Sequence, residues 1–331
     1  MNFNKNKILF FLFSTMSINS FSQNASKIFY SYLLELNNPS FAGLTEISHL
    51  SLISNQTYDL NKRSYGYENF VGTYFFEENN FFLGSKISST HFSDIGLNSM
   101  SLDISYTHKL KLNDQFFVKN ITLYPFITAS YSFPIRLKDV LLEDEILTGA
   151  PSLDPLYLLN NTIGYLDFDA GFLVKNDKFM LGVTINNLRQ ANTATDEENV
   201  ARISRSGDFV FGYQKEFDRF GIFAMASYFH RPAINKEITF SSFRLDQEIM
   251  FNSISFNLFE EFNMNTFQSG LRNIGISIRY KLEEFDFGIG YRSPLGTNAF
   301  NNENSFEAFF RYNFDFLGFL SNKRWEDDSY W

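Results

Sequence analysis

The chain has 331 residues, a formal net charge of −9 at pH 7 and no cysteine. The absence of cysteine excludes disulfides, thiolate nucleophiles and cysteine-ligated metals, and the negative charge argues against nucleic acid as a partner. Phe and Tyr occur 42 and 17 times, yet they are spread over short alternating stretches and form no apolar run long enough for a membrane helix. This composition indicates a membrane protein that crosses the bilayer with strands.

The N-terminus has the features of an export signal. Lys5 and Lys7 precede the apolar stretch 8–13, and Ser20 and Ser22 supply the small residues that a signal peptidase reads. We expect residues 1–22 to be a signal peptide that is cleaved after Ser22. No cysteine follows this site, which excludes a lipid-anchored N-terminus.

Large apolar and polar side chains alternate along the rest of the chain. In one stretch, Leu102, Ile104 and Tyr106 alternate with Asp103 and Ser105, and this period of two predicts a strand with unlike faces. About 14 strands are predicted, at residues 46–58, 65–77, 80–92, 97–110, 115–133, 163–175, 178–188, 205–217, 219–231, 236–246, 247–259, 269–282, 283–293 and 303–316. This number of long strands is larger than a single water-soluble β-sandwich normally contains. We therefore predict an all-β, transmembrane antiparallel β-barrel. An even number of strands would place both termini on the periplasmic side.

Most connections are short and rich in turn residues, but two are long. Residues 134–162 and 189–204 contain the acidic runs 143–145 and 196–198, and both would be extracellular if the first strand runs outward. We interpret these acids as solvated loop residues. Calcium binding by these acids is the alternative. The sequence does not contain the alternating oxygen ligands of a known calcium-binding loop to support it.

Residues that could carry chemistry are few. The four histidines show no pairing at metal-ligand spacing, and His108 lies on the aromatic side of its strand, as expected for an interfacial residue. Asp167 and Asp169 share one strand face and are spaced like paired carboxylates, although ordinary lumen-facing positions explain them equally. We therefore predict no enzymatic activity, no metal and no cofactor.

A distinctive motif lies shortly after the predicted cleavage site. Residues 38–43 read Asn-Pro-Ser-Phe-Ala-Gly, which we call the box; it resembles the Asn-Pro-Ala-(Tyr/Phe)-Ala-Gly motif that opens members of the PorP/SprF family of type IX secretion system membrane proteins. Further family-like features follow at 94–97, 168–171, 182–190 and 290–292, so the resemblance spans nearly the whole mature chain. The chain departs from the family in two ways: Ser40 replaces the usual Ala, and the Gln-rich opening is missing.

The resemblance implies an outer-membrane barrel of the type IX secretion and gliding machinery of Bacteroidetes-type bacteria. Family members work with periplasmic ring or lipoprotein components, and some pair with a large secreted adhesin that they help to export or hold at the cell surface. The implied role is docking, without catalysis. A porin or substrate transporter is the alternative, and it requires an open lumen.

These observations divide the chain into a signal peptide (1–22), a periplasmic N-terminal segment with the box (23–45), the barrel in outer-membrane lipid (46–316) and a periplasmic tail (317–331). We expect the box to launch the first strand and to be exposed to soluble partners. The tail holds both tryptophans, and could dock on a partner or lie at headgroup level. Candidate partner-binding residues are Asn38, Pro39, Phe41, Ala42, Gly43, Trp325, Tyr330 and Trp331.

Overall fold

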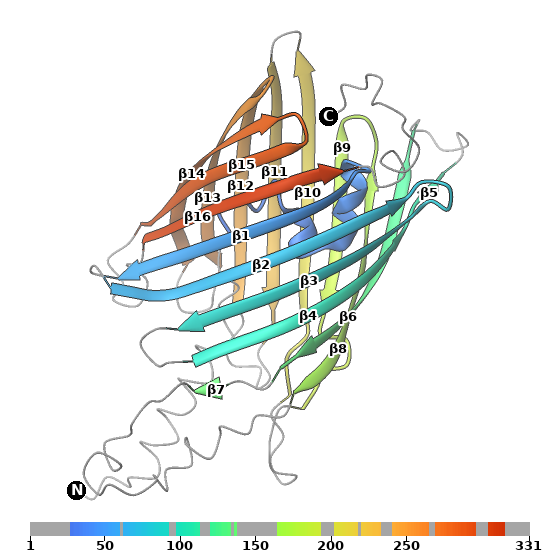
Figure 1. The fold of residues 1–331 in the computed structure, drawn as a ribbon. Helices are drawn as coiled ribbons and strands as arrows, with labels where there is room; N and C mark the ends of the chain where they lie inside the picture. The colour runs from blue at the N-terminus through green and yellow to red at the C-terminus, as the bar shows by residue number, and fades with distance from the viewer. Residues whose placement is uncertain are drawn as a thin grey trace, which may run out of the picture.

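Fourteen long antiparallel strands form a barrel in the computed structural model (Figure 1). The structure describes residues 27–59, 62–92, 97–112, 120–133, 136–137, 164–192, 202–217, 220–232, 240–264, 269–295 and 304–314. The long strands are β1 (Ser48–Asp59), β2 (Lys62–Phe76), β3 (Phe81–Phe92), β4 (Leu97–His108), β6 (Thr122–Ser132), β8 (Tyr165–Lys175), β9 (Phe179–Asn186), β10 (Ser206–Phe217), β11 (Phe220–Arg231), β12 (Phe240–Phe251), β13 (Ile254–Met264), β14 (Ser269–Leu282), β15 (Phe285–Pro294) and β16 (Asn304–Phe314). Two-residue strands, β5 (Leu110–Lys111) and β7 (Arg136–Leu137), extend the sheet beside β6 and β4.

The sheet closes on itself. Each long strand pairs with its neighbours in the chain, β4 pairs with β6, and β16 pairs with β1 from Ser48–Phe314 to Tyr58–Asn304. The predicted closed barrel of 14 strands is therefore confirmed. Because the number is even, β1 begins and β16 ends at the same end of the barrel, where short turns also join β2 to β3, β8 to β9, and β14 to β15. We call this the short-turn end and the opposite one the loop end.

The two faces of the wall differ in the way that the alternation predicts. On β1, Leu50 and Leu52 point outward with 39% and 52% of their surface exposed, whereas His49 and Ser51 face the lumen and are 1% exposed. Large apolar side chains outside and polar ones inside are typical of a barrel in lipid. The described residues contain no helix that is long and apolar enough to span a bilayer.

Aromatic side chains collect at the short-turn end of the outer wall. The rings of Phe76 and Phe81 stack with centroids 4.4 Å apart, and those of Phe217 and Phe220 with centroids 4.7 Å apart. His108 stacks on Tyr106 in the same region, which agrees with its expected interfacial position. Such rings mark the boundary between hydrocarbon and headgroups.

The boundary predicted between residues 246 and 247 is wrong. The sequence suggested strands at 236–246 and 247–259, but β12 continues to Phe251 and the turn falls at Asn252, whose φ of 41° is one that Asn tolerates. Asp246 and Glu248, the two acids beside the predicted boundary, face the lumen and are 1% and 6% exposed. The predicted signal peptide, both acidic runs and the tail lie outside the described residues.

Candidate functional site

The lumen is occupied by the chain's own N-terminal segment. Residues 27–47, which we call the plug, run inside the ring of strands and lead directly into β1 (Figure 1). The plug contains two short 3-10 helices, η1 (Leu34–Leu36) and η2 (Pro39–Leu44). The box forms η2: Asn38 caps it by accepting a hydrogen bond from the Ser40 amide at 3.0 Å, and Pro39 occupies its first position.

The position of the box corrects an expectation. It does precede the first strand, but it is not exposed to soluble partners: Asn38, Phe41 and Ala42 are 2% to 3% exposed, and Gly43 is also buried. The wall covers these residues, and Asn38 donates to the Val183 carbonyl of β9 at 3.4 Å. The structure thus brings the five predicted box residues together inside the lumen. Trp325, Tyr330 and Trp331, the other predicted site residues, lie outside the described chain.

Glycines of the wall form seats for apolar side chains of the plug. A Cβ atom at Gly182 would lie 2.4 Å from the Phe41 ring, and one at Gly290 would lie 2.4 Å from Ile28. Gly288 leaves the same kind of space for Phe29, whose ring would be 2.8 Å from a Cβ. The wall therefore fits this particular plug at three separate places.

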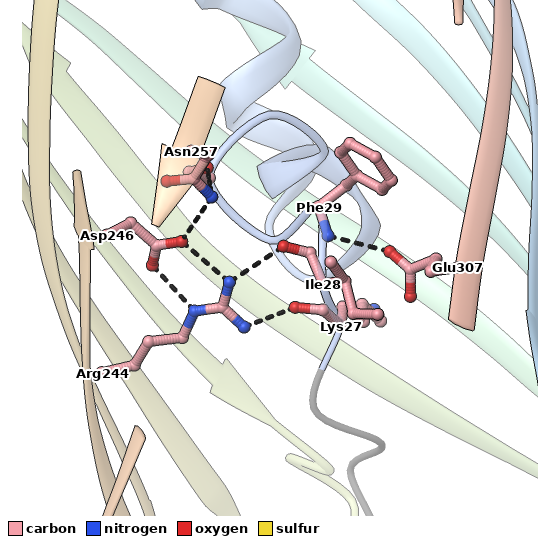
Figure 2. A network of polar contacts seen from close by, with 8 residues as sticks. Lys27, Ile28, Phe29, Arg244, Asp246, Asn257 and Glu307 are labelled. Carbon is pink, nitrogen blue, oxygen red and sulfur yellow. Dashed lines mark hydrogen bonds and ion pairs between the residues drawn. The ribbon is translucent and has the colours of Figure 1, made fainter. Parts of the chain in front are cut away.

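Charged side chains of the wall hold the main chain of the plug (Figure 2). Arg244 of β12 donates to the carbonyls of Lys27 and Ile28, the latter at 3.0 Å, while the Phe29 amide donates to Glu307 of β16 at 2.9 Å. Asp246 accepts two hydrogen bonds from Arg244 at 2.8 Å, which fixes the guanidinium. These contacts to backbone groups fix the path of the plug's main chain, in addition to the contacts that its side chains make with the wall glycines.

Glu35 is the main ionic contact between plug and wall. It forms an ion pair with Arg311 of β16, and His49 Nε2 of β1 lies 3.5 Å from its carboxylate; the Glu35 side chain is 8% exposed. Burial by itself raises the pKa of Glu35, but Arg311 and a hydrogen bond from His49 outweigh it and lower the pKa from 4.5 to about 2. Glu35 is therefore ionised at neutral pH, and removing Arg311 would leave its buried charge without a cationic partner.

We expect the plug to loosen in acid. The pKa of Glu35 is about 2 in the plug and the ordinary 4.5 once it is released, so the ionised carboxylate stabilises the plug above pH 4.5. This contribution, about 3 kcal/mol, is lost as the pH falls from 4.5 toward 2. Ion conductance in planar bilayers should rise over this range. Glu35→Gln should conduct more at neutral pH and lose this part of the pH dependence; identical pH profiles would contradict the assignment.

A second group of contacts fixes the plug at the short-turn end. Lys175 donates to the carbonyls of Gly43 and Leu44 at 2.6 and 3.2 Å. Glu46 pairs with Lys109 and accepts a hydrogen bond from Tyr124 at 2.5 Å. Burial raises the pKa of Glu46, but the hydrogen bonds from Lys109 and Tyr124 outweigh it and hold the pKa below 4.5. The end of the plug is thus fixed where β1 begins.

Apolar side chains seal the lumen in the same region. Phe82, Tyr124 and Met180 lie within the first three residues of β3, β6 and β9, and they pack with Leu34 and Phe41 of the plug in one buried cluster. An apolar cluster of this kind excludes water and hydrated ions. The barrel is consequently closed near the short-turn end.

Between this seal and the middle of the barrel, hydroxyl, charged and apolar side chains line a small cavity. It has a volume of about 40 Å³ and is bordered by Thr73, Ser105, Thr107 and Thr128. The Thr128 hydroxyl has no hydrogen-bond partner among the described residues. The cavity has room for about three water molecules, which could satisfy it.

The predicted carboxylate pair has a structural role in the fold. Asp167 is 2% exposed and accepts hydrogen bonds from the amides of Arg189 and Ala191 at 2.9 and 3.4 Å, and Asp169 accepts one from the Asn187 amide at 2.8 Å. Both therefore hold the segment that follows β9. The described residues include no group of His, Asp or Glu arranged to bind a metal.

Sequence reasoning missed the partners of the plug. Arg244, Glu307 and Arg311 look like ordinary polar positions of strands, and only their lumen-facing register distinguishes them. Gly182 and Gly290 belong to motifs that the sequence analysis noted without assigning a role. These two glycines were the signal in the sequence that could have revealed the contact with the plug, since a glycine in a strand interior often marks a close approach of another segment.

Comparison with known proteins identifies the family. A family model described as "Type IX secretion system membrane protein PorP/SprF" matches residues 19–312. The chain belongs to the PorP/SprF family. Its barrel, apolar outside and polar inside, is an outer-membrane barrel of this type IX secretion family. None of the curated proteins compared with the chain matches it.

Solved outer-membrane barrels are similar in fold. The Omp33 protein of Acinetobacter baumannii is 10% identical with a TM-score of 0.46, covering 81% of this chain and 98% of that one. The toluene transporter TodX of Pseudomonas putida is 9% identical with a TM-score of 0.46, covering 85% and 93%. A TodX deltaS2 mutant, described as a monoaromatic hydrocarbon channel, is 8% identical with a TM-score of 0.49, covering 84% and 93%.

Proposed function

We propose that this PorP/SprF protein is a non-enzymatic docking barrel of the type IX secretion and gliding machinery. It binds periplasmic components of ring or lipoprotein type and helps to export a partner adhesin or to hold it at the cell surface. The observation that carries the proposal is the closed lumen: the plug has its own seats, ion pairs and apolar seal. A barrel closed in this way works through its two ends and its outer wall.

The two ends suit different partners. Bacterial outer-membrane barrels place short turns in the periplasm and long loops outside. The short-turn end would then face periplasmic components with turns such as Glu77–Asn80 and Glu283–Glu284, whose polar side chains are mostly exposed. The loop end would face the adhesin.

An affinity purification from the native host tests this function. The tagged protein is extracted from outer membranes in detergent, and the proteins that accompany it are identified by mass spectrometry, with an unrelated tagged outer-membrane barrel as control. Specific recovery of type IX components or of one large surface protein is the expected result. Recovery of the barrel alone would contradict the docking role.

The tail gives a narrower prediction. Residues 318–331 follow the last strand and contain Trp325 and Trp331, and we expect them to contribute to docking in the periplasm. Deleting them should leave the barrel folded, as judged by heat-dependent mobility on gels, but should reduce recovery of the periplasmic partner. Unchanged recovery would show that the tail does not dock.

A porin or transporter is the second candidate, since small solutes could pass if the plug moved aside. The small cavity beside the plug is the observation that favours it, because polar side chains, among them Lys86 and Asp103, lie on its border. Planar bilayers distinguish the two functions: stable conductance of the intact protein at neutral pH would support the porin, and a silent protein would support docking.

A further inference from the structure

The plug fills the lumen without belonging to the sheet. The strand pairings that close the barrel involve only strands of the wall. Among the described residues, the backbone-to-backbone hydrogen bonds of the plug all join two of its own residues, as when the Leu33 amide donates to the Phe29 carbonyl at 2.9 Å. The plug leads into the wall where Ser48 begins β1. The lumen is therefore a site that a polypeptide segment occupies, and the sheet is complete without that segment.

Charged side chains of the wall contact the main chain of the plug at both ends and in the middle. Arg244 and Glu307 hold one end (Figure 2), and Lys175 of β8 holds the other. Between them, Lys86 of β3 donates to the Leu36 carbonyl at 2.9 Å. Carbonyl and amide groups are common to polypeptides of any sequence, so these contacts suit any chain that follows the same path.

Tyr32 of the plug is held through its side chain. Its ring lies against the guanidinium groups of Arg279 and Arg311, whose central carbons are 4.1 and 4.7 Å from the ring centroid. Its hydroxyl donates to Asp286 of β15 at 2.5 Å, and its ring lies beside Phe309 with centroids 5.0 Å apart. A ring between two cations, with its hydroxyl on a carboxylate, favours tyrosine over any other side chain.

Five side chains of the plug define what the lumen selects. We call them the anchors: an aliphatic and an aromatic residue in succession, a tyrosine, a carboxylate and a second aromatic residue, which are Ile28, Phe29, Tyr32, Glu35 and Phe41. Wall glycines receive the three apolar anchors, and wall arginines receive the other two. Side-chain anchors combined with main-chain hydrogen bonds are the means by which proteins bind peptides specifically.

We propose that the lumen is a polypeptide-binding site that the plug occupies, and that a separate segment carrying these anchors at the same spacing binds there when the plug is released. Because no strand pairing joins plug and wall, one segment can replace another without a break in the sheet. The inference deepens the docking function proposed above, since the lumen would receive a segment of the partner. Only the identity of that partner rests on the docking function.

A synthetic peptide of residues 27–47 and the barrel that lacks residues 28–44 test the site. The labelled peptide is titrated with the purified barrel in detergent, and fluorescence anisotropy reports binding. The native-order peptide should bind at least about tenfold more tightly than a scrambled peptide of the same composition, because only the native order places each anchor at its receiving group. A peptide with Glu35→Gln should bind more weakly, since Arg311 loses its partner.

Equal affinities of the native-order and scrambled peptides would overturn the proposal. Both components are purified, so this result is independent of whether the affinity purification from the host recovers a partner. Failure of the docking function and failure of the peptide site are thereby distinguished. Heat-dependent gel mobility confirms that the shortened barrel is folded.

The full chain with Gly182→Val supplies a second measurement that does not depend on the shortened barrel. A Cβ at this position would lie 2.4 Å from the Phe41 ring, so a peptide with Phe41→Ala should bind this variant about tenfold more tightly than the unchanged peptide. Neither peptide should bind Gly207→Val, where the nearest contact of a Cβ is 3.7 Å and the plug stays seated. Absent binding, or equal binding of the two peptides, to a folded Gly182→Val barrel would also overturn the proposal.

Discussion

Deleting residues 28–44 is expected to turn the closed barrel into an open pore. The deletion removes the side chains of Phe29, Glu35 and Phe41 together, which empties the seats and eliminates the main ionic contact and the seal at once. The wall keeps its hydrogen bonds between strands, because no strand is shortened. In planar bilayers, the conductance should rise at least about tenfold above the leak of the intact protein, since a polar lumen of this width admits hydrated ions.

A deletion at the other end of the chain is the matched control. Removing residues 318–331 shortens the protein by a similar length but leaves the plug in place, so its conductance should equal that of the intact protein. If the variant without residues 28–44 folds and still does not conduct, then the seal formed by the plug is not what closes the barrel.

Gly182→Val is expected to push the box out of its seat. The first atom of the new side chain would lie 2.4 Å from the Phe41 ring, and the wall strand cannot retreat without breaking its pairing with β10. Overpacking of this kind costs about 1–3 kcal/mol, which corresponds to a roughly 5- to 150-fold shift toward the released plug. The shift can be measured as faster cleavage of the plug by added protease in detergent, together with increased conductance.

The same substitution at Gly207 supplies the comparison. Gly207 is a glycine of the adjacent strand β10, but a Cβ there would have its nearest contact at an ordinary 3.7 Å, so Gly207→Val should leave the plug in place. Combining Gly182→Val with Phe41→Ala should restore part of the seal, because the smaller side chain vacates the seat. Equal effects of Gly182→Val and Gly207→Val would mean that general loss of stability, rather than the seat, explains the result.

The strands could be predicted because their signal is local. Each strand carries its own alternation, as Asp103 and Ser105 do between Leu102, Ile104 and Tyr106, and lipid outside with a polar lumen requires that pattern wherever the strand lies. The error at β12 also concerns neighbouring residues: Asp246 and Glu248 lie at the predicted boundary, and only the lumen explains why acids occur in the middle of a strand.

The sequence by itself determined the period of the strands, their approximate number, the family resemblance and the presence of the Asn-Pro-Ser-Phe-Ala-Gly box, all of which are properties of neighbouring residues. Only the tertiary structure decided where the box lies. Its partners, among them Gly182, Arg244 and Glu307, come from strands that are far apart in the chain, and no period in the sequence marks which lumen-facing residues will meet. Closure of the barrel brings them around one segment, and that segment closes the lumen.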